Sequence, residues 1–83
     1  MAAVDWKRVA KATLHPIQVE ILEAAADRDK LSPVQFHDGG ASVSRVAYHF
    51  RALHKAGLLE AAGTAPRRGA TEHFYRLSRA ARG

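Results

Sequence analysis

Residues 42–59 read SVSRVAYHFRALHKAGLL, and this segment has the strongest structural signals of the chain. Ser42 is a residue type that caps helix N-termini and Gly57 is one that ends helices, so the segment predicts a helix over 43–56. Apolar side chains recur there at i, i+4 and i+7, which predicts a buried stripe of Val46, Phe50 and Leu53. The remaining face is polar and basic, so this helix can pack on a domain and present charge to a partner.

The polar face of residues 43–56 has the side chains of a helix that reads DNA. One α-helix fits the major groove of B-DNA, which is about 12 Å wide, and the first turn of such a helix usually reaches deepest. Arginine can pair with guanine through two hydrogen bonds, while lysine suits phosphate. We expect base contacts from Ser44, Arg45 and Tyr48, with Tyr48 also suited to phosphate, and phosphate contacts from Arg51 and Lys55. An ordinary solvated face is the alternative.

Downstream of Gly57 the sequence period changes from helical to alternating. Leu58 and Leu59 open a strand, residues 63–69 predict a loop, and residues 71–77 alternate as a second strand does. We therefore expect a β-hairpin over 58–77 whose tip, residues 63–70, carries Arg67 and Arg68 to phosphates or to the minor groove. A solvated loop is the alternative for this tip.

Upstream, three further helices are predicted. Asp5 can cap a first helix over 5–13, and Pro16 suits the first turn of a second helix over 16–26. Leu31 is expected to add a single residue of strand. Ser32 and Pro33 are a start signal for a short helix over 33–38, which Gly39 and Gly40 end.

Together these elements predict one domain over residues 1–83, since a chain of 83 residues is too short for two. Its expected class is mainly α with a small β-hairpin. The specific expectation is a winged helix-turn-helix, with three to four helices and a wing of two to three strands. Residues 33–56 form the helix-turn-helix, residues 58–77 the wing, and residues 78–83 a frayed tail.

The net charge of +5 is unevenly distributed along the chain. Residues 1–40 contain five Lys and Arg against six Asp and Glu, whereas residues 41–83 contain eight against two. The entire basic excess therefore lies in the second half of the chain, which contains the predicted reading helix and wing. Such asymmetry favours a polyanionic partner, with ordinary solubilising charge as the alternative.

Two segments resemble the winged-helix domain of arsenic-repressor-type (ArsR-type) bacterial transcriptional regulators. Residues 42–59 contain that family's Val-x-x-His-hydrophobic-x-x-Leu frame and its Ala-Gly-Leu exit, and residues 67–77 are similar to its wing and last strand. His15 and Pro16 match the start of the family's preceding helix, so the resemblance covers about three-quarters of the chain. It implies a symmetric dimer that binds adjacent major grooves and usually represses transcription.

The chain departs from that family in two respects. It has no cysteine, so soft-metal sensing through thiolates is not expected. It also ends just after the last predicted strand, without the C-terminal helix that family members use for dimerisation. A homodimer, expected at least on DNA, would then rest on the first helix, with candidate anchors Trp6, Val9 and Leu14. The alternative is a protein that is monomeric until DNA pairs two copies.

Other classes of function have little support in the sequence. The chain has no phosphate loop, dinucleotide motif or Gly-x-Ser-x-Gly, so we expect no enzymatic activity and no cofactor. His49 and His54 are five residues apart rather than four, His49 fits a structural position, and no metal is expected. No apolar run approaches the roughly 18 residues that span a bilayer, and the N-terminus becomes charged too early for a secretory signal, so a cytoplasmic, nucleoid-associated location is expected.

The expected function is sequence-specific binding of double-stranded DNA by a transcriptional regulator, most simply a repressor. One alternative is a winged-helix module for protein interaction, which would more often show an apolar patch where this chain is basic. The other is a non-specific architectural DNA-binding protein.

Overall fold

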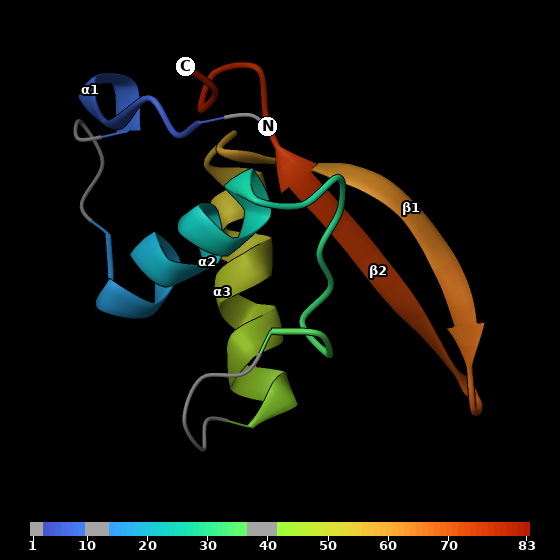
Figure 1. Ribbon diagram of the computed structural model, residues 1–83. Helices are drawn as coiled ribbons and strands as arrows, with labels where there is room; N and C mark the ends of the chain where they lie inside the picture. Colours follow the sequence, from blue (N-terminus) through green and yellow to red (C-terminus); the bar gives the residue numbers. More distant parts are fainter. Residues whose placement is uncertain (1–2, 10–13, 37–41) are drawn as a thin grey trace.

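The computed structural model describes residues 3–9, 14–36 and 42–83 (Figure 1). Three helices and an antiparallel hairpin follow one another in this part of the chain. Figure 1 shows α2 beside α3 and the hairpin extending away from both helices. The elements are α1 (Trp6–Val9), α2 (Pro16–Ala26), α3 (Val43–Lys55), β1 (Leu59–Arg67) and β2 (Ala70–Leu77).

Helices α1 and α2 begin where the sequence predicts. Asp5 Oδ1 accepts hydrogen bonds from the backbone N–H groups of Lys7 and Arg8 at 3.1 and 3.3 Å, which is the predicted cap of α1. Residues 10–13, the second half of that predicted helix, lie outside the described residues. Pro16 occupies the first turn of α2, and the Gln18 side chain accepts a hydrogen bond from the backbone N–H of His15 at 3.1 Å.

The helix predicted over 33–38 is wrong for its described part, residues 33–36, which form a single turn. The start signal is nevertheless real. The backbone N–H of Gln35 donates to Ser32 Oγ at 3.3 Å, and the Gln35 side chain accepts from the backbone N–H of Ser32 at 3.1 Å. The backbone N–H of Phe36 closes the turn on the Ser32 carbonyl at 3.2 Å. Residues 37 and 38 and the predicted Gly39–Gly40 stop lie outside the described residues.

The hairpin is longer than predicted because β1 continues through most of the expected loop. The predicted loop over 63–69 is wrong: β1 extends to Arg67, and only Arg68 and Gly69 form the turn. Both have positive φ, 35° and 77°, as in the two-residue turns that match the twist of a hairpin. Gly63, with φ 111°, lies where the register shifts by one residue, so it marks a bulge rather than the start of a loop.

The core lies where α2, α3 and the base of the hairpin meet. Phe50 of α3 is fully buried, with its ring 5.5 Å from that of Tyr75 on β2 and 6.1 Å from that of Phe36. Leu31 pairs with Tyr75 through two backbone hydrogen bonds of 2.8 Å, which confirms the expected one-residue strand contact. The predicted stripe of α3 is confirmed, since Val46, Phe50 and Leu53 are all buried.

Residues 78–83 are ordered against the start of the chain, so the predicted frayed tail is wrong. The hydroxyl of Ser78 donates to the Gly57 carbonyl at 2.5 Å, and Ala81 is fully buried. The backbone N–H of Asp5 donates to the Ala81 carbonyl at 2.8 Å, and Val4 forms a β-bridge with Arg82. Alternating apolar patterns do not reveal this contact, because the segment forms neither a regular helix nor a strand.

These differences overturn the expected fold class. Among the described residues there are three helices and a two-stranded hairpin, with about 39% helix and 28% strand, and this coarse α and β composition is not mainly α. The first helix of the expected helix-turn-helix, over 33–38, is one turn in its described residues, and the expected small wing is a hairpin with strands of nine and eight residues. The winged helix-turn-helix assignment is therefore not upheld.

Candidate nucleic-acid interface

The exposed face of α3 concentrates the predicted contact residues. Ser42 caps this helix, because its Oγ accepts a hydrogen bond from the backbone N–H of Arg45 at 3.2 Å. The buried stripe fixes the opposite face in the core. Four exposed side chains recur at i, i+4, i+7 and i+11 and point away from that core: Ser44, Tyr48, Arg51 and Lys55. The helix contains no acidic residue, so this face has one sign of charge.

A buried polar contact holds α3 against α2. His49 is buried, as its structural assignment predicts, and its Nδ1 lies 3.2 Å from Gln18 Nε2. The ring of His15 meets the His49 ring edge-on at 5.3 Å, and the ring of Tyr48 does so at the same distance from the exposed side. The orientation of α3, and with it that of Tyr48, is therefore tied to α2.

The tip of the hairpin exposes two adjacent arginines with unequal surroundings. Arg67 Nη1 lies 3.8 Å from Glu72 Oε1, and Glu72 also accepts a hydrogen bond from the Ser32 hydroxyl at 2.5 Å. Arg68 is exposed and makes no salt bridge to any described residue. Arg68 is thus the less compensated charge at this tip.

The base of the hairpin has charges of both signs. Arg76 Nε donates to Glu60 Oε1 at 2.6 Å. This hydrogen bond is the main cause that lowers the pKa of Glu60, and the charges of Arg76, Arg82 and Arg79 act in the same direction. The pair spans the two strands in direct register, so it contributes to strand pairing.

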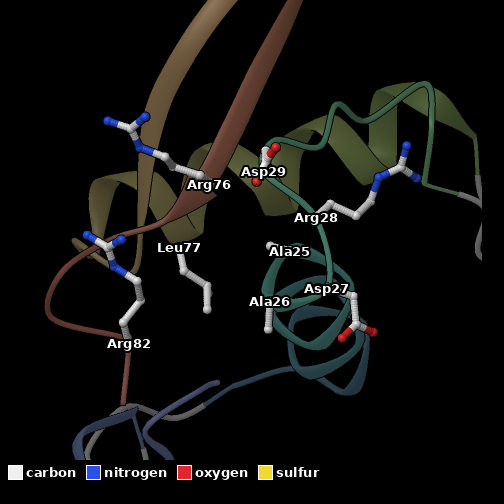
Figure 2. Close-up of a pocket in the computed structure, with 8 residues that line it drawn as sticks. All are labelled: Ala25, Ala26, Asp27, Arg28, Asp29, Arg76, Leu77 and Arg82. Atoms are coloured by element: carbon white, nitrogen blue, oxygen red, sulfur yellow. The ribbon is translucent and has the colours of Figure 1, made fainter. Parts of the chain in front are cut away.

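A pocket of about 560 Å³ lies between the end of α2 and the base of β2. Figure 2 shows Arg76 and Arg82 on its hairpin side, while Arg28 extends away from them. Asp27 and Asp29 line the same pocket. Because carboxylates are interspersed with the arginines, and because the carbonyl end of α2 faces this region, the pocket does not favour a polyanion.

A second groove, of about 360 Å³, runs between α3 and the hairpin. Val43, Ala47 and Arg51 line it from α3, at i, i+4 and i+8. Pro33 and Val34 line it from the turn, and residues 71–73 and Tyr75 from β2. The groove thus joins the exposed face of α3 to the hairpin.

No family model, curated protein or solved structure matches this chain. The assignment of a function therefore depends on the residues and their arrangement. Within the described ranges, no helix has the length and apolar character needed to cross a membrane. The same ranges contain no group of three or more His, Asp or Glu side chains placed to hold a metal ion.

The predicted contact residues fall into one helix face and one hairpin tip. All seven are exposed: Ser44, Arg45, Tyr48, Arg51, Lys55, Arg67 and Arg68. Arg45 leaves α3 on the flank of the exposed stripe rather than at its centre, since it is one position after Ser44 in a helix that turns about 100° per residue.

The three predicted dimer anchors differ in how deeply they are buried. Val9 is fully buried in the core of its own chain, so its assignment as an interface residue is wrong. Leu14 packs partly against the same core. Trp6 remains 41% exposed and is the member of this set with a large accessible surface.

Sequence reasoning missed the groove and its residue Val43. Val43 is 53% exposed although it lies three positions before buried Val46, a spacing that suggests the buried face. Its place as the first residue of the predicted helix was a signal of exposure, because the end of a helix can project beyond the turns that pack on the core.

Proposed function

We propose that this protein binds double-stranded DNA in a sequence-specific manner and regulates transcription. In this proposal α3 enters the major groove, and the tip of the hairpin contacts the phosphate backbone or the minor groove. One observation carries the proposal: the face of α3 opposite the core contains Ser44, Tyr48, Arg51 and Lys55 and no acidic side chain. Arginine and lysine on such a face suit phosphate and guanine, and serine and tyrosine suit bases or phosphate.

Three further features support this proposal. The basic excess of the chain lies entirely in residues 41–83. The exposed tip of the hairpin adds Arg67 and Arg68. Residues 42–59 and 67–77 resemble the corresponding segments of ArsR-type regulators, from which we propose repression as the output and action on chromosomal DNA in the cytoplasm.

We also propose that the protein acts on DNA as a homodimer. Symmetric binding to a repeated site would need a contact between copies, and Trp6 is the exposed candidate of the three predicted anchors. An enriched sequence with two related half-sites would support this arrangement, and its spacing would give the geometry of the pair. A single unrepeated site would contradict it.

The test is a titration with duplex DNA at several salt concentrations, followed by selection of enriched sequences from a random library. Arg51 and Lys55 are replaced by alanine in one variant. The matched control replaces Lys7 and Arg8 by alanine. Both residues are exposed on α1, so this variant loses the same charge from another part of the molecule. We expect the first variant to lower the salt slope by about 2 units, at about 0.9 per phosphate contact, and the control to leave it unchanged.

The outcomes distinguish the candidate functions. Enrichment of a defined sequence supports the proposal. Binding that falls steeply with salt but enriches no sequence indicates an architectural protein instead. The absence of duplex binding at low salt favours a protein-interaction module, for which exposed Val43 and Tyr48 are the first surface to test.

A further inference from the structure

Val43 begins α3 with an unusual exposure for a branched apolar side chain. It is 53% exposed and directly precedes Ser44 and Arg45, the candidate base-reading residues of the first turn. Ala47 follows one turn later on the same side of the helix and is half-buried. An apolar edge therefore runs beside the polar stripe of α3.

This apolar edge opens into the groove between α3 and the hairpin. Pro33 and Val34 form part of the opposite wall, so the groove has apolar groups on two sides. Glu72 also lines it, but its carboxylate already accepts from the Ser32 hydroxyl and lies close to Arg67. Arg51, at the end of the helix row, lines the same groove and also belongs to the basic stripe of α3, so the apolar edge and the basic stripe lie side by side.

A basic helix stripe beside an apolar edge matches the surface of duplex DNA in one specific respect. The C5-methyl of thymine is the apolar group that base pairs present in the major groove, and alanine and other small apolar side chains contact it. A phosphate backbone on either side suits the arginines. Ligands without negative charge would leave the basic stripe of α3 without a counter-charge.

We infer that Val43 and Ala47 recognise thymine methyl groups, and hence that the preferred duplex contains thymine at the position facing the first two turns of α3. This inference rests on the proposed DNA-binding function. It assigns Val43 and Ala47 to sequence preference and not to overall attraction, because neither residue has a charge.

The test uses the enriched duplex and a series in which each thymine is replaced singly by deoxyuridine, which lacks only the methyl group. At one or two positions the replacement should weaken binding about fourfold, corresponding to about 0.8 kcal/mol for a buried methyl-sized group. In Val43→Ser the thymine and uracil duplexes should bind nearly equally at the affected position. Ala52→Ser, a half-buried alanine on the other side of α3, is the matched control and should keep the difference.

Each result has a distinct meaning. If a sequence is enriched but no uracil replacement affects binding, the methyl inference is overturned while the proposed function stands. If every uracil effect persists at full size in Val43→Ser, the assignment to this side chain is overturned. If no sequence is enriched, the proposed function fails and the inference fails with it. Circular dichroism of each variant checks that α3 is retained.

Discussion

Arg45 differs from the other basic residues of α3 in the direction in which it leaves the helix. Arg51 belongs to the stripe opposite the core, whereas Arg45 lies on the flank, on the side away from Val43 and Ala47. Its backbone N–H is held by the Ser42 cap, so the start of its side chain is fixed relative to the domain. An arginine whose side chain starts from a fixed position in the first turn is suited to pair with one particular guanine. A contact with phosphate does not require such a fixed starting position.

Replacing Arg45 by alanine should therefore weaken binding to the enriched duplex by about 1–3 kcal/mol and relax the preference at one base pair. Arg45→Lys keeps the charge but cannot form the two parallel hydrogen bonds of a guanidinium. It should relax the same preference while leaving the salt slope nearly unchanged. Affinity measurements against the four base pairs at each position give both quantities, and an unaltered preference in both variants would exclude Arg45 from base reading.

At the scale of elements, the hairpin turn combines charge with backbone strain. Arg68 has φ 35°, a region that a residue with a Cβ adopts at a cost of roughly 1 kcal/mol and that asparagine tolerates better. Asparagine followed by glycine is the preferred pair for a turn of this kind. The presence of arginine at this position is explained if its charge contacts DNA phosphate.

Arg68→Asn should separate the stability of the hairpin from its binding. We expect the free energy of unfolding to rise by a few tenths to about 1 kcal/mol, as relief of strain at the turn predicts. The salt slope for duplex binding should fall by about 1 unit, because one phosphate contact is lost. Urea denaturation and the salt titration measure the two effects. Unchanged DNA binding would show that Arg68 is a solvated turn residue and makes no phosphate contact.

The base of the hairpin should respond to acid through Glu60. Its pKa is lowered in the folded protein, mainly by the hydrogen bond from Arg76, so the pair stabilises the fold above the pKa of Glu60 in the unfolded chain. That contribution is lost as the pH falls through the lower, folded pKa. Glu60→Gln should therefore flatten this part of the dependence of stability on pH, and it should reduce stability at neutral pH.

Urea denaturation between pH 7 and pH 3 tests this prediction, with Glu23→Gln as the control because Glu23 is an exposed carboxylate on α2. The control should keep the wild-type profile. If Glu60→Gln also keeps it, the Arg76 hydrogen bond makes no net contribution to folding.

The elements that the sequence predicted correctly are those with both a cap and a buried stripe. Helix α3 has Ser42, Gly57 and a regular apolar spacing, and α2 has Pro16 at its start. The wrong elements depend on neighbours distant in sequence. Gly63 and Pro66 are typical of a loop, yet pairing with β2 keeps both within β1, because a bulge takes up the glycine and proline is tolerated in a strand that lies at a sheet edge.

At the scale of the whole molecule, the charged residues of the candidate site were predictable but its shape was not. Exposed arginines and lysines follow from helical spacing, whereas the groove beside Val43 is assembled from three segments: the turn at 33–34, α3 and β2. For Val9, the sequence predicted a place in an interface that the structure does not support. Val9 was an apolar residue on a short helix, which suits an interface equally well, and only its fully buried position beside the core excludes that role.

The contact between residues 3–5 and 81–83 should contribute to the thermal stability of the whole molecule. Ala81 is fully buried, while the neighbouring Ala80 is exposed, so the two alanines are a matched pair for adding a charge. Ala81→Asp would bury a carboxylate and should cost about 2 kcal/mol or more, which lowers the Tm by roughly 8 °C or more for a domain of this size. Ala80→Asp should leave the Tm within a few degrees.

Thermal denaturation followed by circular dichroism measures this difference, and hydrogen exchange at Asp5 locates it, since that N–H donates to the Ala81 carbonyl. Equal Tm values for the two variants would contradict a stabilising role for this contact. Below the Tm, folded Ala81→Asp should bind duplex DNA as the unaltered protein does, because α3 and the hairpin tip do not contribute to the contact between residues 3–5 and 81–83. Loss of DNA binding in a variant that is still folded would instead show that the contact supports the orientation of α3 through α2.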